Sequence, residues 1–196
     1  MIFDLHVHTT ISKCSQLKIE EILTHAQSRG LDGVCITDHE DMGIGRFVRE
    51  GIQENGLCII FGMEYSTPHG DFILFGPFEN IPFGLCAREL LKTVNQSAGV
   101  AIAAHPFRKN NTTEEYVFSE GLCSNIERIN GRNSVSENGL TKDWIDKYNL
   151  IGSGGSDAHT LPELGRVKTH FATPIQNRFD LIKELKTGHC SIETAV

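Results

Sequence analysis

No run of about 18 apolar residues occurs in this sequence, so it holds no candidate for a membrane-spanning helix. Residues 1–10 lack the basic flank and the long apolar stretch of a secretory signal, and we therefore expect a cytoplasmic protein. Positive charge is also scarce, because 18 Lys and Arg stand against 25 Asp and Glu, for a formal net charge of −7. Long nucleic acids are bound mainly through cations that neutralise phosphates. We therefore expect no extended nucleic-acid surface and no contact with a membrane.

The sequence also lacks CxxC pairs and any regular spacing of its six cysteines. Three cysteines lie in or beside apolar runs (Cys35, Cys58 and Cys86), which favours buried thiols in a reducing compartment over disulfides. No glycine-rich loop of the P-loop or dinucleotide-binding type is present, and no linker or low-complexity tract divides the chain. With 196 residues, 39% of them hydrophobic, we expect a single domain over residues 1–196.

Short apolar runs alternate with longer amphipathic stretches along the chain. The runs predict strands at residues 1–8, 33–39, 57–66, 71–76, 100–105, 125–130, 150–157 and 168–174. The amphipathic stretches predict helices at residues 17–30, 42–56, 87–99, 136–148 and 178–188. Repeated strand-then-helix units predict an α/β fold with a mostly parallel sheet, either open and doubly wound or closed into a small barrel.

Residues with nitrogen and oxygen ligand atoms stand where the predicted strands end. They are His6, His8, His39, Glu64, His105, Asp157 and His159. The carboxyl ends of parallel strands gather on one face of such folds, so we expect these side chains to converge. His6 and His8 are two residues apart, as are Asp157 and His159, and each pair points to one side of an extended segment. Imidazole combined with carboxylate suits Zn, Mn or Fe better than Ca or Mg.

The number of donors indicates more than one ion. Seven groups exceed what one tetrahedral ion uses, so two or three ions that share a carboxylate such as Glu64 fit the set better. A multinuclear centre clamps a phosphoryl group, lowers the pKa of bound water and stabilises the leaving oxygen. The residues therefore favour hydrolysis, most naturally of a phosphoester.

Six segments resemble, in sequence order, the motifs of the PHP (polymerase and histidinol phosphatase) domain family: DLHVHT, ITDH, GMEYS, AAHP, NIERINGR and GSDAHTLPELG. The resemblance runs from Asp4 to about Phe171, nearly the whole chain. It implies a distorted (β/α)7 barrel with a two- or three-metal centre at the carboxyl ends of the strands. It also implies a phosphoesterase that acts on small phosphorylated metabolites, nucleotides, or DNA and RNA ends. The ligand sets that it implies are His6, His8, Glu64 and Asp157 for one ion, Glu64 and His105 for a second, and His39 and His159 for a third.

The sequence departs from the family where a third ion would bind. Many members carry an acidic residue or a histidine shortly after the HxH motif, whereas this chain has Lys13 and Cys14 there. Cys14 is either a thiolate ligand or a plain loop cysteine. Similarly, His69 or Asp71 would either complete the second ion or lie in a solvated loop. The glycines of residues 152–157 are expected to let the backbone pass close to the metals.

Other residues near the strand ends are assigned supporting roles. Arg108 and Arg132 are predicted to bind substrate, because a guanidinium group matches phosphate oxygens with paired donors. Asp38 and Glu127 are predicted to orient ligand histidines.

We predict a metal-dependent phosphoesterase that hydrolyses a small phosphorylated metabolite or nucleotide through a metal-activated water. Asp157 and His159 are the predicted catalytic residues, with His159 or a water giving a proton to the leaving oxygen. Two alternatives stay open: a metal-stabilised, non-catalytic accessory module, and a metallohydrolase of amide or lactone bonds. An enzyme predicts turnover of a model phosphoester, whereas an accessory module predicts bound metal without turnover.

Overall fold

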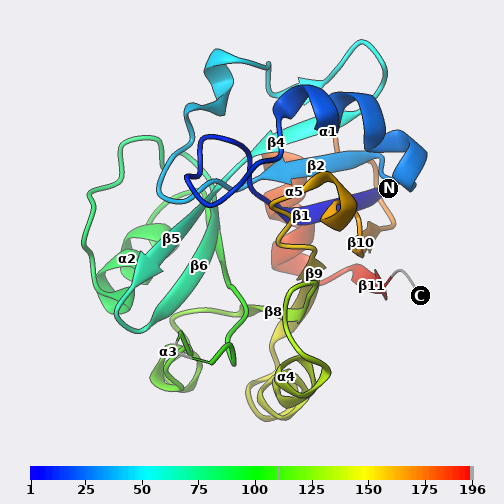
Figure 1. The fold of residues 1–196 in the computed structure, drawn as a ribbon. Coiled ribbons are helices and arrows are strands. Elements are labelled where there is room, and N and C mark those ends of the chain that lie inside the picture. The colour runs from blue at the N-terminus through cyan, green and yellow to red at the C-terminus, as the bar shows by residue number, and fades with distance from the viewer. Residues whose placement is uncertain (110, 195–196) are drawn as a thin grey trace.

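The computed structural model describes residues 1–109 and 111–194, and it places two β-sheets around a shared apolar core (Figure 1). The six-stranded sheet has the order β11-β10-β1-β2-β4-β3. Its strands are β1 (Ile2–Val7), β2 (Gly33–Ile36), β3 (Gly51–Ile52), β4 (Cys58–Phe61), β10 (Val167–Phe171) and β11 (Cys190–Thr194). The five-stranded sheet has the order β5-β6-β7-β8-β9. Its strands are β5 (Met63–Thr67), β6 (Gly70–Phe75), β7 (Val100–Ala103), β8 (Asn125–Asn130) and β9 (Ile151–Gly155).

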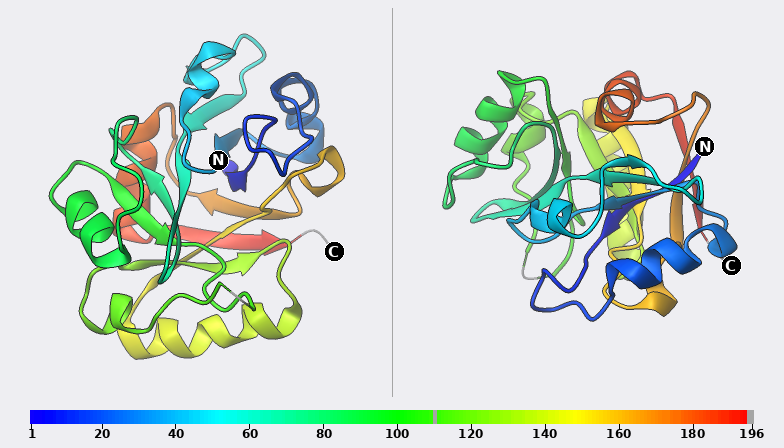
Figure 2. Two further views of the ribbon diagram at one scale, coloured as in Figure 1. Left: turned by 60° about the vertical axis from the view of Figure 1, so that its left-hand side comes forward. Right: turned by 90° about the horizontal axis from the view of Figure 1, so that it is seen from above.

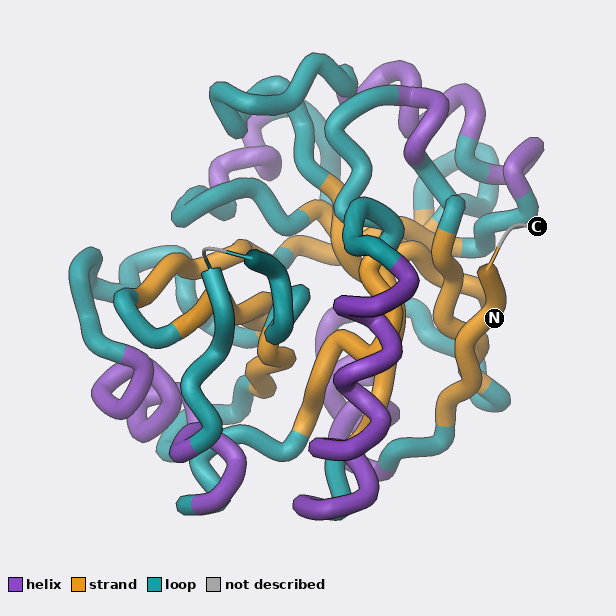
Figure 3. Tube along the Cα trace, turned by 60° about the horizontal axis from the view of Figure 1, so that its bottom comes forward, coloured by secondary structure: helices purple, strands orange, loops and turns teal. Residues whose placement is uncertain are grey.

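Five α-helices are described around these sheets (Figure 2, Figure 3). They are α1 (Ile19–His25), α2 (Ala87–Asn95), α3 (Tyr116–Ser119), α4 (Val135–Tyr148) and α5 (Arg178–Thr187). The longest, α4, packs on β8. It begins where the Ser134 hydroxyl accepts a hydrogen bond from the Glu137 N–H, and it ends at Asn149 in the left-handed conformation.

An apolar core joins the two sheets. It combines Phe3 and Leu5 of β1 with Phe75 of β6 and Ile102 of β7, and α5 adds Leu181. All are buried, and burial of this much apolar surface is the main force that holds the sheets together. At the carboxyl ends of the strands, two isolated bridges also join the sheets, Val7 with Ala158 and His39 with Glu64. Residues predicted to bind metal therefore stand at the seams between the sheets.

The α/β class is confirmed, although the sheets are mixed where we predicted mostly parallel pairing. Parallel pairs such as β1–β2 and β7–β8 occur beside antiparallel pairs such as β5–β6 and β1–β10. The described strands form two sheets, and closure into a (β/α)7 barrel stays a prediction. Within the described residues, no helix is long and apolar enough to cross a bilayer.

Two of the predicted elements are wrong in detail. The helix predicted at residues 42–56 is a 3-10 turn over Gly43–Arg46 followed by β3. Its four glycines cost helix stability, and Gly51 and Gly56 take a positive φ that a helix excludes. The strand predicted at residues 57–66 is divided at Gly62 into β4 and β5, which belong to different sheets. The free thiols that we predicted are present, with Cys35 and Cys58 buried and Cys86 partly buried.

Candidate metal centre

All seven side chains predicted to bind metal lie together, and the Glu64 carboxylate is at their centre. Glu64 Oε1 lies 2.7 Å from His105 Nε2. Glu64 Oε2 lies 3.1 Å from His39 Nδ1, 3.2 Å from His8 Nε2 and 3.4 Å from His6 Nε2. The backbone brings these groups together because β1, β2, β7 and β9 end here and β5 begins here. The predicted convergence is thus present in the fold, and ligation itself stays a prediction.

Within the described residues, three groups of donor atoms could each hold an ion. The groups are His6, His8 and Asp157; His6, Glu64 and His105; and His8, His39 and His159, with all donor atoms of a group within 4.8 Å of one another. They correspond broadly to the three ligand sets implied by the family resemblance. They differ in what is shared, because His6 and His8 each belong to two groups, whereas Glu64, expected in the first and second sets, belongs only to the group with His6 and His105.

The geometry of the donors fits a cation. His6 Nδ1 must donate to the Glu127 carboxylate, 3.0 Å away, which leaves the lone pair on Nε2. That nitrogen lies 3.0 Å from His8 Nε2. The His8 Nδ1 faces the Ser12 hydroxyl at 3.3 Å, and this hydroxyl already gives its own proton to Asp38. Both Nε2 lone pairs therefore point at one spot, where a positive charge removes their repulsion.

The spacing of the donors also matches a small ion. Ligands about 2.0–2.1 Å from a tetrahedral Zn²⁺ lie about 3.3 Å from each other. The separations from Asp157 Oδ1 are 3.4 Å to His8 Nε2 and 3.7 Å to His6 Nε2. Histidine and carboxylate side chains rarely lie this close together in a buried space unless bound partners offset the cost of burying their polar atoms.

The electrostatic field of the site favours cations. Burial opposes ionisation of Glu64, but the His6 ring and hydrogen bonds from His105 and His39 outweigh it and hold its pKa well below the usual range. Burial likewise opposes ionisation of Asp157, and the His6 and His8 rings beside it hold its pKa low. For His6, burial lowers the pKa, yet Glu127, Asp157 and Glu64 raise it well above the normal value. A field that retains a proton on a buried imidazole also attracts a metal ion.

Backbone strain is concentrated at the site. His105 has a φ of 28° and Asp157 a φ of 55°, and both lie directly after buried strands. Positive φ costs free energy for residues other than glycine, and such residues cluster at functional sites. At Gly155, an added Cβ would lie 2.4 Å from the Cβ of His6. The glycine-rich segment therefore lies against His6, and its approach to metal ions stays a prediction.

Two carboxylates hold the ligand histidines in place, in different ways. Glu127 contacts two of the strand ends, because Oε1 accepts from His6 Nδ1 and Oε2 accepts from the His105 N–H at 2.8 Å. Asp38 forms no hydrogen bond with a histidine ring among the described contacts. It accepts from the hydroxyls of Thr9 and Ser12, both at 2.6 Å, and so orders the segment after β1. Asp38 thus reaches the His8 ring through the Ser12 hydroxyl.

A third carboxylate, Asp4, was missed by the sequence reasoning. Asp4 accepts hydrogen bonds from Ser156 and from the N–H of Gly165, and so joins β1 to the segment after β9. Burial raises the pKa of Asp4 to about 6 despite these hydrogen bonds. Only its position inside an apolar strand, one residue after Phe3, could have signalled a buried role.

Both predicted substrate-binding arginines reach the donor groups. Arg108 Nη2 donates to Asp157 Oδ2 at 2.7 Å and to Asn130 Oδ1 at 2.9 Å. The Nη1 of Arg132 lies 3.0 Å from His159 Nδ1. The guanidinium groups of both arginines remain partly exposed, with 29% of the Arg108 side chain and 43% of the Arg132 side chain open to solvent. They therefore lie at the rim, where an anion would enter.

The three residues left open by the sequence lie in different surroundings. Cys14 is exposed and belongs to none of the three groups, and partial burial raises the pKa of its thiol, which disfavours a thiolate. His69 packs edge-on against Tyr116, away from the three groups. Asp71 is buried, with Oδ2 3.9 Å from His105 Nε2, and its Oδ1 has no partner among the described residues. His69 Nδ1 also lacks a partner among the described residues, and Asp71 Oδ1 is an unused acceptor on a carboxylate that lies beside His105 of the second group.

The sequence matches known proteins of one family. Residues 135–190 match the family model PHP_C, described as PHP-associated. An uncharacterized protein of Methanocaldococcus jannaschii, MJ1587, is 35% identical over 114 residues, which cover 53% of this chain and 67% of that protein. The chain belongs to the PHP family. A probable histidinol-phosphatase of Thermotoga maritima is 27% identical to this PHP chain over 112 residues, or 46% of the chain and 47% of that protein.

Solved structures share the fold of this PHP chain at low sequence identity. PsfC from Pseudomonas syringae PB-5123 has a TM-score of 0.79 and 20% identity, and the match covers 100% of this chain and 91% of PsfC. A two-domain protein from Bacteroides vulgatus that contains a predicted PHP-like metal-dependent phosphoesterase has a TM-score of 0.72 and 17% identity, over 99% of this chain and 64% of that one.

A third structure contradicts our expectation about partners. Endonuclease Q, in complex with a 27-mer duplex that has an abasic lesion at the active site, has a TM-score of 0.71 and 18% identity, over 99% of this chain and 58% of that chain. The same fold therefore works on duplex DNA, and the expectation of no extended nucleic-acid surface is wrong. The reasoning failed because a net charge of −7 averages over the whole surface, whereas phosphate binding depends on the local field at the site.

Proposed function

We propose that this PHP chain is a metal-dependent phosphoesterase. The observation that carries the proposal is the arrangement around Glu64, where three groups of nitrogen and oxygen donors, all buried except the exposed His39, lie together and share histidines. A structural metal site uses four ligands in a closed shell, whereas this arrangement offers seven donors and a partly exposed rim. The excess of donors argues against a purely structural role.

Two or three divalent ions, Zn, Mn or Fe, would occupy the centre. His6, His8 and Asp157 would hold one ion, Glu64 and His105 a second, and His39 and His159 a third. We add Asp71 to the second set, because its buried Oδ1 lacks a partner among the described residues. When bound, such ions lower the pKa of a water and neutralise charge that develops on the phosphoryl group.

The chain's own residues would bind and orient the phosphate. Arg108 is fixed by Asp157 and Asn130, so its remaining N–H groups are pre-oriented toward the rim. Arg132 would supply the second guanidinium from beside His159. His159 is almost buried, and in a two-ion centre, where it ligates no metal, it would pass a proton to the leaving oxygen. Asp157 would act through both carboxylate oxygens, with Oδ1 toward the histidines and Oδ2 toward Arg108.

We also propose that the two sheets are parts of one distorted barrel. The bridges Val7–Ala158 and His39–Glu64 lie at the two seams between the sheets, and the core between the sheets contains side chains of both. This arrangement supports a ring in which the carboxyl ends of β1, β2, β7 and β9 face the donors.

We consider two candidate classes of substrate. The likeness to a probable histidinol-phosphatase favours a small phosphomonoester. The fold shared with Endonuclease Q favours a phosphodiester in a nucleic acid as the second candidate.

The test is a substrate panel on metal-loaded protein. It contains phosphomonoesters, phosphodiesters, an abasic-site duplex and one amide, and it is run on wild type, Asp157→Asn and Asp146→Asn. Asp146 is exposed on α4, so this control changes the same chemical group outside the site. We expect turnover of a phosphoester by wild type and Asp146→Asn, and a loss of at least about 100-fold in Asp157→Asn. Equal activity in all three proteins, or turnover of the amide alone, would overturn the proposal.

A further inference from the structure

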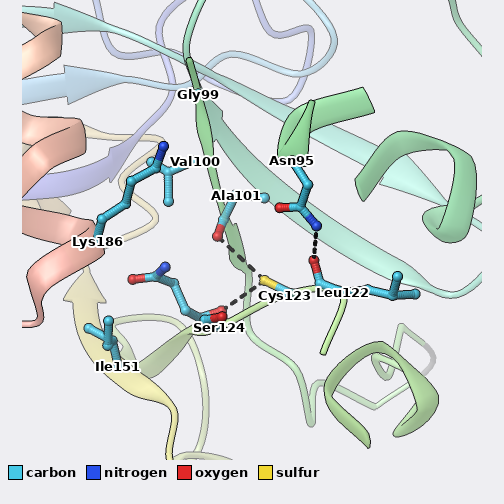
Figure 4. A pocket seen from close by; sticks show the side chains of 10 residues that line it. Asn95, Gly99, Val100, Ala101, Leu122, Cys123, Ser124, Ile151 and Lys186 are labelled. Carbon is cyan, nitrogen blue, oxygen red and sulfur yellow. Dashed lines mark hydrogen bonds between the residues drawn. The ribbon is translucent and has the colours of Figure 1, made fainter. Parts of the chain in front are cut away.

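A cavity of about 170 Å³ lies at the other end of the strands from the metal centre (Figure 4). Val100, Asn125 and Ile151 are the first residues of β7, β8 and β9, and all three line it. The metal centre is built at the carboxyl ends of the strands, so the cavity is a separate place. Its lining is Asn95, Gly99, Val100, Ala101, Leu122, Cys123, Ser124, Asn125, Ile151 and Lys186.

The lining carries a positive charge without a counter-charge. It includes Lys186 and no aspartate or glutamate. Lys186 comes from the last turn of α5, and Figure 4 shows its side chain reaching toward Val100 on β7. Across the part of the chain that the structure describes, Lys186 makes no ion pair. The side chain is exposed, so its ammonium is free to pair with an anion in the cavity.

The buried amide of Asn125 is also without a partner. Asn125 is only 3% exposed, and its Oδ1 makes no hydrogen bond within residues 1–109 and 111–194. Neighbouring groups in the same lining are satisfied, since Asn95 Nδ2 donates to the Leu122 carbonyl at 3.0 Å and Cys123 Sγ donates to the Asn125 carbonyl at 3.2 Å. Buried polar groups are nearly always hydrogen-bonded, so Asn125 Oδ1 requires a donor that the protein does not supply.

We propose that this cavity is a second binding site, which takes a small oxyacid anion that carries its own hydroxyl. Hydrogen phosphate and hydroxy-carboxylates share this chemistry. The anionic oxygens would pair with the Lys186 ammonium, and the hydroxyl would donate to Asn125 Oδ1. A volume of about 170 Å³ admits an ion of this size. The site is independent of the phosphoesterase function proposed above.

The first experiment is calorimetric titration of metal-free protein with inorganic phosphate. Lys186→Met removes the charge, and Lys183→Met is the matched control, because Lys183 is exposed on the same helix and does not line the cavity. Arg108→Ala weakens phosphate binding at the metal centre and so identifies heat from that site. We expect affinity to fall at least about tenfold in Lys186→Met and to be retained in Lys183→Met and Arg108→Ala.

The choice of anion tests the role of the hydroxyl. Sulfate carries no proton at neutral pH and should bind about tenfold more weakly than phosphate. Glycolate, which has a carboxylate and a hydroxyl, distinguishes the carboxylate source from the phosphate source. Unchanged phosphate affinity in Lys186→Met, loss only in Arg108→Ala, or equal binding of sulfate would each overturn the proposal.

A second measurement does not depend on heat of binding. Phosphate should raise the midpoint of thermal unfolding of the Arg108→Ala protein and have no such effect on Arg108→Ala with Lys186→Met. Both changed residues are partly or fully exposed, so both variants should fold. Equal shifts in the two variants would contradict the proposed site.

Discussion

Replacement of Glu127 by glutamine should weaken metal binding although Glu127 is predicted to touch no metal. Glu127 Oε2 accepts from two donors, the His105 N–H at 2.8 Å and Asn130 Nδ2 at 2.9 Å, while Oε1 accepts from His6 Nδ1 at 3.0 Å. Glutamine has one carbonyl oxygen. If that oxygen faces the two donors, the amide N–H₂ faces His6 Nδ1 and forces this nitrogen to accept.

The consequence falls on the opposite nitrogen of the His6 ring. When Nδ1 accepts, the proton of the neutral ring moves to Nε2, which is the nitrogen directed at His8 and Asp157. A protonated Nε2 cannot ligate. Loss of such an outer partner commonly costs 10- to 100-fold in metal affinity, or about 1.4–2.7 kcal/mol. We expect Glu127→Gln to lower the affinity for Zn²⁺ or Mn²⁺ by this amount.

The assay is competition with a chelator, with metal content measured at each step. Glu193→Gln is the matched control, because Glu193 Oε2 also contacts a histidine, His170 Nε2 at 2.9 Å, in an exposed pair on β10 and β11. Glu193→Gln should bind metal like wild type. Unfolding by urea is recorded for both variants to show that they are folded. Wild-type affinity in Glu127→Gln would refute the assignment of His6 Nε2 as a ligand atom.

Contacts elsewhere in the molecule support three further predictions. Arg108→Lys keeps the charge but loses the forked guanidinium group that reaches Asn130, Asn133 and Asp157. We expect kcat/KM for the phosphoester to fall about tenfold while metal content is unchanged. Loss of metal in this variant would instead assign Arg108 a structural role. Gly155→Ala should lose metal, because its added Cβ would collide with His6. Gly139→Ala lies in the interior of α4 with open space around it, and should instead stabilise the fold by roughly 0.5–1 kcal/mol. Equal effects of the two changes in a urea titration would contradict this distinction. Hydrogen bonds from the N–H groups of Ser134 and Lys109 lower the pKa of Glu137 to about 2 from 4.5, so the stability that this carboxylate contributes is present above pH 4.5 and is lost as the pH falls through about 2. The difference in unfolding midpoint between wild type and Glu137→Gln should therefore shrink over this pH range. A difference that stays constant would contradict the prediction.

The set of candidate functional side chains can be predicted from the amino-acid sequence alone. HxH, TDH, GME, AAH and SDAH each follow an apolar run, and parallel strands carry such residues to one edge, so the order of residues is enough to predict that the seven donors converge. The glycines of residues 152–157 could also be expected to lie near the donors because they lead directly into Asp157, and the structure adds that Gly155 has no room for a side chain beside His6. Local patterns suffice for these features because they depend on which residue follows which strand.

How those side chains are held depends on tertiary contacts. Glu127 orients His6 across 121 positions of sequence, Asp4 contacts Ser156 across 152, and no local pattern encodes either distance. The helix expected at residues 42–56 failed because its apolar spacing competes with glycines and with the edge pairing of β3 on β4. The net charge illustrates the same limit, because composition reports only a sum of charges over the whole protein. The electric field at a buried centre depends instead on which few groups the fold places within some 4 Å of one another.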